Sequence, residues 1–203
     1  MKKELLFILN PTAGKTHIKN NLFEVINAFS DANYRVTVYP TKQPNDGQNI
    51  VISEGNDYDL IVCAGGDGTL DDVVTGYMQS KCQVPLGYIP AGSTNDFARS
   101  LGIPLEPLAA VENIISGFPF RVDVGCFNQD DYFIYVAAFG AFTEVSYSTN
   151  QQFKNMFGHA AYVMSSIRGL NNITPYTATI RYDDREITDT FIYAMVTNSL
   201  SVG

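Results

Sequence analysis

The chain has 203 residues, 45% of them hydrophobic and only 17% charged, so it can bury an ordinary core and is not disordered by composition. Its formal net charge is −8, and the parts on either side of Val122 are both acidic. This balance argues against nucleic-acid binding and against a polybasic grip on anionic lipid. Three cysteines without a CxxC pair do not indicate a disulfide framework, which fits a cytoplasmic protein.

The first ~120 residues alternate short apolar runs with amphipathic stretches, the pattern of βαβ units around a parallel sheet. Strands are expected at four apolar runs: Leu5–Leu9, Tyr34–Tyr39, Leu60–Ala64 and Leu86–Ile89. Helices are expected where apolar residues recur every three or four positions: Leu22–Phe29, Asn45–Ser53, Leu70–Met78, Phe97–Leu101 and Pro107–Ile115. The sequence therefore predicts an α/β domain with a parallel sheet.

The pattern changes near Val122, where hairpins replace βαβ units. Further strands are expected at Arg121–Phe127, Tyr132–Ala138, Thr177–Tyr182 and Ile187–Thr197, and a helix along the apolar stripe from Ala160 to Ile167. We therefore expect two domains, 1–122 and 123–203, of which the second is mostly antiparallel. Because the sequence stops at Gly203, soon after a predicted strand, this second domain is expected to be incomplete. An open strand edge there could pair in a homodimer.

Three segments rich in glycine or turn-forming residues follow three of the predicted strands, at 10–16, 65–69 and 90–96. In an open α/β sheet, ligands bind beyond the carboxyl ends of the parallel strands. All three segments should therefore line one edge of the sheet. Their convergence is stronger evidence for a binding site than any one segment.

The segment from Gly65 to Thr69, Gly-Gly-Asp-Gly-Thr, is the most specific of the three. Glycine lets the backbone come close to a phosphate, and the helix expected from Leu70 directs free amides at the same point. Asp67 would repel a phosphate, so we expect it to hold Mg²⁺, while Thr69 caps the helix or contacts a phosphate. The alternative is a tight turn in which Asp67 serves only as a cap.

The segment 10–16 ends the first strand with Asn10 and contains Lys15, a candidate phosphate contact. It lacks the first glycine of a Walker A loop, and a solvated Lys15 at a helix start is an equal alternative. Thr41, just after the second strand, could touch a nucleotide or be a surface turn residue.

The segment 90–96 ends in four short polar residues, Ser93, Thr94, Asn95 and Asp96. One of them must cap the helix that follows, and the others indicate a ligand at the same edge. Asp96 is the second carboxylate there, and paired acids at a phosphoryl site commonly hold metal.

Three motifs in this order carry a resemblance to a known family: Asn10-Pro11-Thr12-Ala13-Gly14, Gly65-Gly66-Asp67-Gly68-Thr69 and Gly92-Ser93-Thr94-Asn95-Asp96-Phe97-Ala98. Together they resemble the catalytic domain of the diacylglycerol kinase and sphingosine kinase superfamily, especially its soluble bacterial lipid kinases. The stretch Arg121-Val122-Asp123-Val124-Gly125 is similar to the family's crossing into its second domain.

The resemblance implies an ATP-dependent lipid kinase that uses Mg²⁺. It also implies a three-layer nucleotide-binding domain and a β-sandwich second domain, with the lipid entering between them. The residues expected to bind the nucleotide are Asn10, Pro11, Thr12, Ala13, Gly14, Thr41, Gly65, Gly66, Asp67, Gly68, Thr69, Leu70, Asp71, Ser93, Thr94 and Asn95. Metal is expected at Asp67 and Asp96.

The family's general base lies beyond Gly203 in the pattern, so no catalytic residue is assigned in this chain. Contact with the membrane is expected to be transient and peripheral, through an apolar rim. The sequence does not name the lipid acceptor.

Two alternatives stay open. NAD kinase shares the Gly-Gly-Asp-Gly-Thr element, but it would need a different segment rich in asparagine and glycine at 90–96. A non-catalytic module that binds a nucleotide or a lipid is the second alternative. Such a module would keep its ligand affinity in an Asp67→Ala variant, whereas a kinase would lose phosphoryl transfer.

Overall fold

The computed structural model describes residues 2–13, 17–127, 130–140 and 174–198. These residues form two compact units, which are described separately. The first holds the chain up to Tyr135 together with Thr197 and Asn198, and the second runs from Val136 to Val196. The domain boundary after Val122 stays a prediction.

The centre of the first unit is a four-stranded sheet, in which every neighbouring pair of strands is parallel. Its strands are β1 Lys3–Leu9, β2 Tyr34–Pro40, β3 Leu60–Gly65 and β4 Leu86–Pro90, in the order β2-β1-β3-β4. The continuous apolar runs in β1 and β3 are buried because helices cover both faces of the sheet. The predicted α/β fold with a parallel sheet is confirmed.

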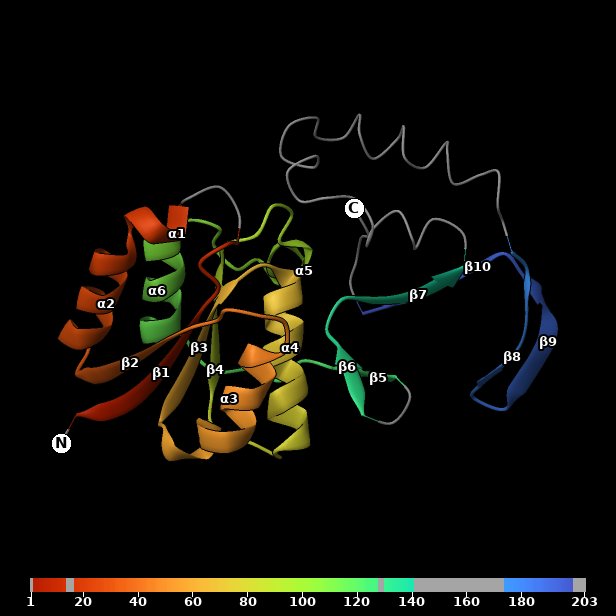
Figure 1. Cartoon of the computed structure of the whole chain (residues 1–203), viewed down its shortest axis with the longest axis horizontal. Coiled ribbons are helices and arrows are strands. Elements are labelled where there is room, and N and C mark those ends of the chain that lie inside the picture. Colours follow the sequence, from red (N-terminus) through yellow and green to blue (C-terminus); the bar gives the residue numbers. More distant parts are fainter. Residues whose placement is uncertain (1, 14–16, 128–129, 141–173, 199–203) are drawn as a thin grey trace. The chain divides into compact units, whose positions relative to one another are not determined.

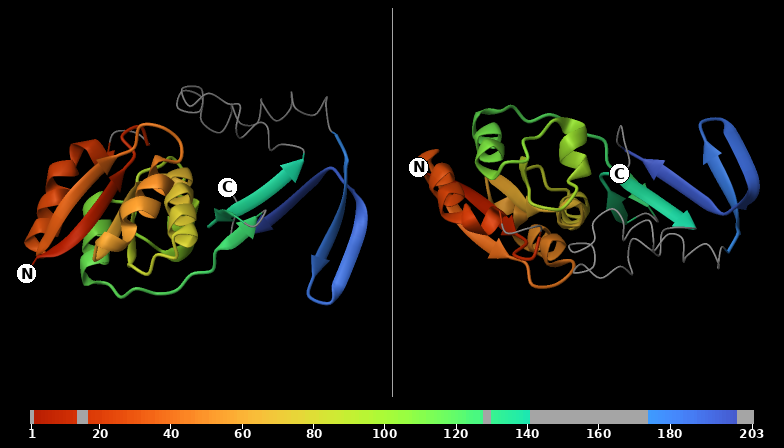
Figure 2. Two further views of the ribbon diagram at one scale, coloured as in Figure 1. Left: turned by 60° about the horizontal axis from the view of Figure 1, so that its bottom comes forward. Right: turned by 90° about the horizontal axis from the view of Figure 1, so that it is seen from above.

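Helices form a layer on each face of this sheet (Figures 1 and 2). In chain order they are α1 His17–Asn20, α2 Leu22–Asp31, α3 Asp46–Glu54, α4 Asp67–Gln79, α5 Asp96–Leu101 and α6 Pro107–Ser116, with a 3-10 turn, η1, at Gly55–Asp57. One core cluster packs α2 and α6 against the sheet, around Phe7 and Phe29. A second cluster packs α3, α4 and α5 against the opposite face, around Leu6 and Leu70. The three expected layers are therefore present.

A short antiparallel hairpin, β5 Gly125–Phe127 with β6 Asp131–Phe133, also belongs to the first unit. The strand expected at Arg121–Phe127 is thus shorter than predicted. The strand expected at Tyr132–Ala138 is interrupted at Ile134 and Tyr135, where the first unit ends. Ile134 is buried, and its backbone N–H turns toward a side chain of α4 instead of a partner strand.

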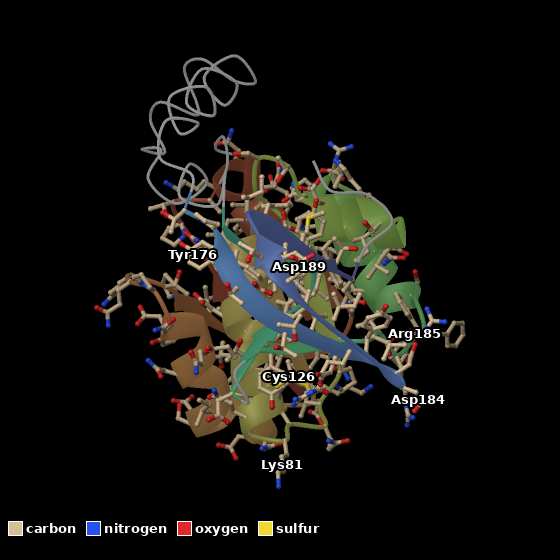
Figure 3. The ribbon with its side chains drawn as sticks, turned by 90° about the vertical axis from the view of Figure 1, so that its right-hand side faces the viewer. Lys81, Cys126, Tyr176, Asp184, Arg185 and Asp189 are labelled. Atoms are coloured by element: carbon tan, nitrogen blue, oxygen red, sulfur yellow. The ribbon has the colours of Figure 1, made fainter. Side chains whose placement is uncertain are left out.

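The described part of the second unit contains two strand pairs, β7 Val136–Gly140 with β10 Tyr193–Thr197, and β8 Tyr176–Tyr182 with β9 Arg185–Phe191. The last residue of β10, Thr197, already belongs to the first unit. The β8–β9 hairpin is antiparallel, and Asp184 and Arg185 lie at its turn (Figure 3). The strand expected at Ile187–Thr197 is divided at Ile192, because β9 and β10 pair with different strands. The helix predicted at Ala160–Ile167 lies outside the described residues.

Candidate active site

Backbone hydrogen bonds continue the parallel ladder past the carboxyl ends of the strands and align the loops that follow them. The N–H of Asn10 donates to the carbonyl of Ala64 at 2.9 Å, and the N–H of Ala91 donates to that of Gly65 at 2.7 Å. Thr41 N donates to Leu9 O at 2.8 Å. The loops after β1, β2, β3 and β4 therefore lie along one edge of the sheet, as their positions in the sequence predict.

The loops after β3 and β4 come into direct backbone contact at two glycines. A Cβ added at Gly92 would lie 2.6 Å from the Cα of Gly66, and one added at Gly66 would lie 3.2 Å from the Cα of Gly92. Gly92 therefore needs glycine for packing alone, whereas a side chain at Gly66 would be tightly crowded. The first turn of α4 and the loop before α5 consequently form one continuous backbone surface.

The loop after β1 is tied to the same turn by Asn10. Its side-chain amide donates to Thr69 Oγ1 at 2.8 Å, while its Oδ1 accepts the backbone N–H and the hydroxyl of Thr12, both at 2.9 Å. The hydroxyl of Thr69, expected to cap α4 or to contact a phosphate, accepts this bond, and the residue is buried. Asn10 thus fixes the position of its own loop against α4.

Asn95 closes the loop after β4. Its Oδ1 accepts the N–H of Gly92 at 2.8 Å, and its amide donates to the carbonyl of Gly92 at 3.1 Å. The residue is buried and has a φ of 53°, in the left-handed region that asparagine tolerates better than most residues. The Asn95 side chain is therefore committed to the loop, and its neighbours Ser93 and Thr94 are exposed.

The carboxylate of Asp67 faces the N-terminus of α5. It accepts the N–H of Asp96 at 3.2 Å, the N–H of Phe97 at 3.3 Å and the hydroxyl of Thr94 at 3.5 Å. Burial raises the pKa of Asp67, and the nearby Asp96 carboxylate adds to this rise, while the backbone donors oppose it. Asp67 therefore caps α5, the next helix along the chain, rather than its own helix, α4.

Two carboxylates close enough to repel each other offer hard oxygen ligands of the kind that Mg²⁺ takes. Within the described ranges there is no group of three or more His, Cys, Asp or Glu side chains able to hold a metal ion. Asp67 and Asp96 could therefore supply only part of a coordination shell. Mg²⁺ commonly completes its shell with water and substrate phosphate oxygens.

Gly68, in the first turn of α4, faces open space. A Cβ built there would meet no atom within 4 Å from any described part of the chain outside its own helix and neighbours. The helix has 13 residues, and the N–H groups of its first turn have no partners within the helix. Open space above these amides fits a phosphate, which the partial positive charge of the helix end would also favour.

Three of the predicted contact residues are buried or already form hydrogen bonds within the protein. Leu70 is buried in the core, and its N–H donates to Gly66 O at 3.1 Å. Gly65 is buried, and its carbonyl accepts from Ala91 N and from the hydroxyl of Tyr88. Asp71 accepts the N–H of Ile134 at 3.0 Å, and burial raises the pKa of its carboxyl to about 6.

Thr41 lies in sequence between Pro40 and Lys42, which line a surface hollow of about 420 Å³ together with Tyr39, Gln43 and Asp46. The carboxylate of Asp46 shapes this loop, since it accepts the N–H of Lys42 at 2.7 Å and that of Gln43 at 3.1 Å. These hydrogen bonds lower the pKa of Asp46. Asp46 was not identified from the sequence, although a short acidic residue at the start of a predicted helix is a capping signal.

The remaining predicted residues are less informative. Pro11 and Ala13 are partly buried in the loop after β1, whereas Gly14 and Lys15 lie outside the described residues.

Among the described helices, none combines the length and the apolar character that a membrane crossing requires.

A parallel α/β sheet with glycine-containing loops at its carboxyl edge is the architecture of the nucleotide-binding-like class of α/β proteins. Within that class, the chain belongs to the diacylglycerol kinase catalytic domain family, whose model matches residues 4–127. The resemblance drawn from the three motifs is thereby confirmed.

The chain is similar to diacylglycerol kinases of Bacillus subtilis (36% identity) and Staphylococcus carnosus (38% identity), over 99% and 90% of its own length. It is also similar to the crystal structure of a putative diacylglycerol kinase from Bacillus anthracis, with a TM-score of 0.81 and 29% identity over 99% of the chain. The chain spans 67% of the B. subtilis protein, 60% of the S. carnosus protein and 66% of the B. anthracis structure.

Proposed function

We propose that the chain carries the ATP-binding part of a lipid kinase, which transfers the γ-phosphate of ATP to the hydroxyl of a diacylglycerol-like lipid. Membership in the diacylglycerol kinase catalytic domain family supports this reaction over the NAD kinase alternative. The names of the B. subtilis and S. carnosus relatives support diacylglycerol as the acceptor.

The open first turn of α4 is the observation that carries the proposal. Gly68 leaves room above free helix amides, and the contact between Gly66 and Gly92 brings a second backbone segment alongside. A phosphate chain is bound well by such backbone donors, which need no net positive charge on the protein. This matters in a chain whose net charge is −8.

In this proposal, the amides at Gly66, Asp67 and Gly68 hold phosphate oxygens, with the hydroxyls of Thr12 and Thr94 nearby. The hollow next to Thr41 would hold another part of the nucleotide. Asp67 and Asp96 would hold Mg²⁺ directly or through water, and the ion would supply charge neutralisation on the phosphates. Leu70 and Gly65 would contribute through their packing alone.

No residue of this chain is assigned the role of general base. We propose that the second part of the chain belongs to the region that binds the lipid. An acidic protein would meet the membrane transiently, through apolar contact rather than electrostatic attraction.

The proposal is tested by the Gly68→Ala variant. Alanine is a better helix former than glycine and has free space here, so the fold should be as stable or more stable by up to ~1 kcal/mol. The same methyl group would fill the space proposed for a phosphate, and the affinity for MgATP should fall at least tenfold. Titration calorimetry with MgATP measures the affinity, and Glu112→Ala, at an exposed position of α6, serves as the control.

Activity is measured on the full chain that the gene encodes. The assay follows the transfer of labelled γ-phosphate from MgATP into diacylglycerol in mixed micelles. Labelled phospholipid from the wild type, with little from Gly68→Ala, supports the proposal. Bound ATP without labelled lipid would leave a nucleotide-binding module, and labelled NADP formed from NAD in a parallel assay would indicate a NAD kinase. Unchanged ATP affinity in Gly68→Ala would remove the phosphate site from α4.

A further inference from the structure

One face of α4 forms three hydrogen bonds with the backbone of the segment that leaves the first unit. Asp71 Oδ1 accepts the N–H of Ile134 at 3.0 Å, Thr75 Oγ1 donates to Tyr132 O at 3.4 Å, and Gln79 Nε2 donates to Asp130 O at 2.9 Å. In Figures 1 and 2, α4 lies beside β6, in agreement with these bonds. We call the three bonds the α4 ladder.

The spacing of the ladder matches the geometry of a helix beside a strand. Its side chains are four residues apart on the helix, which is a rise of ~6 Å, and they meet backbone groups two residues apart, which span ~6.6 Å in a strand. The three positions therefore share one helix face and contact every second residue of the segment. Shifting the segment by one residue would break all three bonds.

Gln79 is itself held in the orientation that the ladder needs. Its Oε1 accepts the amide of Gln48 in α3 at 2.9 Å, which leaves its Nε2 to donate to Asp130 O. Both ends of the Gln79 amide are thus used, and the far end of the ladder is anchored to a second helix.

The segment is also tied to the place where the chain returns to the first unit. The backbone N–H of Asn198 donates to Tyr135 O at 2.8 Å, and its side-chain amide donates to Ile134 O at 3.2 Å and to Asp123 O at 2.6 Å. The segments that leave and re-enter the first unit are therefore hydrogen-bonded to each other at Ile134 and Tyr135. Asp71 in turn binds Ile134 to α4.

We propose that Asp71, Thr75 and Gln79 are positioning residues, which hold the departing segment, Asp130–Ile134, in fixed register with α4. Gly66 and the first turn of α4, residues 66–69, are the proposed phosphate loop. The inference rests on the proposed function, because the register matters only if a nucleotide binds at the start of α4. In this inference, Asp71 binds the backbone of the departing segment and does not contact ATP directly.

A kinetic test uses the double variant Thr75→Val/Gln79→Ala, which leaves the residues of the phosphate loop intact. The affinity for MgATP should stay within about twofold of the wild type, while kcat/KM for the lipid should fall about tenfold, since small misplacements at a reacting site are costly. The matched control is Thr37→Val/Gln83→Ala, at exposed positions outside the ladder. Unchanged lipid kinetics, or an equal loss of ATP affinity and lipid kinetics, would overturn the proposal.

Hydrogen exchange gives a readout that does not depend on activity. MgATP should slow exchange at the amides of the first turn of α4 and also at Ile134, because local opening at Ile134 requires Asp71 to release it. In the double variant, the first turn should keep this response, and the response at Ile134 should be smaller than in the wild type, because Asp71 alone then holds the segment. Protection of the first turn with no change at Ile134 in the wild type would overturn the inference alone. No protection at either place would overturn the proposed function, and the inference with it.

Discussion

Gly66 and Gly92 touch through their backbones, so that a Cβ at Gly92 would lie 2.6 Å from the Cα of Gly66. The obstacle is backbone rather than the end of a flexible side chain, and Asn95 Oδ1 would also lie 2.8 Å from the new atom. Gly92→Ala should therefore lower the free energy of unfolding by about 1–3 kcal/mol, the usual cost of overpacking. Urea unfolding followed by circular dichroism measures this loss.

The Gly68→Ala variant is the matched comparison, because the same methyl group enters open space there. If Gly92→Ala unfolds at the same urea concentration as Gly68→Ala, the contact between the two loops is looser than the structure shows.

Substitution of the two site carboxylates should separate a structural role from metal binding. Asp67→Asn removes one of the oxygens that cap α5 and should cost ~1 kcal/mol of stability, as lost caps commonly do. Asp96→Asn removes a charge that repels Asp67 and should leave the stability within ~0.5 kcal/mol of the wild type. Both variants should lose Mg²⁺-dependent ATP affinity.

The measurement is ATP titration with and without Mg²⁺, next to a urea unfolding curve for each variant. A role of Asp96 in metal binding is refuted if Asp96→Asn keeps the full effect of Mg²⁺ on ATP affinity.

The buried carboxyl of Asp71 predicts a specific dependence of stability on pH. Its pKa is about 6 in the folded chain, against an ordinary value of 3.8, so the folded state holds the proton more tightly than the unfolded state. The stabilising contribution is complete below pH ~4 and is lost as the pH rises through 6. Two pKa units correspond to at most about 3 kcal/mol. Asp71→Asn, which keeps an acceptor for Ile134, should therefore become more stable than the wild type at pH 7.

Urea unfolding at pH 4.5, 5.5 and 7 measures this difference without nucleotide or metal. The difference in stability between Asp71→Asn and the wild type should grow with pH across this range. A constant difference would mean that Asp71 ionises in the folded chain as it does in the unfolded one.

The parallel half of the fold follows from local patterns in the sequence. The run Leu5–Leu9 is apolar throughout, and only a strand covered on both faces buries all of it. Glycine-rich turns after such strands must lie at one sheet edge, so the sequence predicts that Asn10, Gly66 and Asp67 lie together. The division of strands at Ile134 and Ile192 could not be predicted, because both breaks depend on partners distant in the sequence.

The hydrogen-bond partners of the site side chains also could not be predicted from the local sequence. Asp67 was expected beside a metal, and its contacts with the backbone of Asp96 and Phe97 depend on how two loops meet. Likewise, nothing in the sequence around Asp71 indicates that it accepts a bond from a residue 63 positions away. Pattern predicts which residues reach the sheet edge, whereas tertiary packing decides which groups there remain available for a ligand.

Tyr88 was not identified from the sequence, and its role can be measured. It lies in β4 and is buried, and its hydroxyl donates to the carbonyl of Gly65 at 3.1 Å, directly before the phosphate loop. Tyr88→Phe removes this bond without a change of shape, and Gly65 O keeps a partner in Ala91 N. The free energy of unfolding should therefore fall by about 1 kcal/mol, the net value of one hydrogen bond, rather than by the larger cost of an orphaned carbonyl.

The same variant reports on the loop, because Tyr88 fixes the last residue of β3 before α4 begins. We expect the affinity for MgATP to fall about threefold while the fold stays intact. Tyr58→Phe is the control, since its hydroxyl lies 3.5 Å from Glu54 at an exposed site. Equal effects of the two substitutions on ATP affinity would show that the bond from Tyr88 to Gly65 does not help to order the phosphate loop.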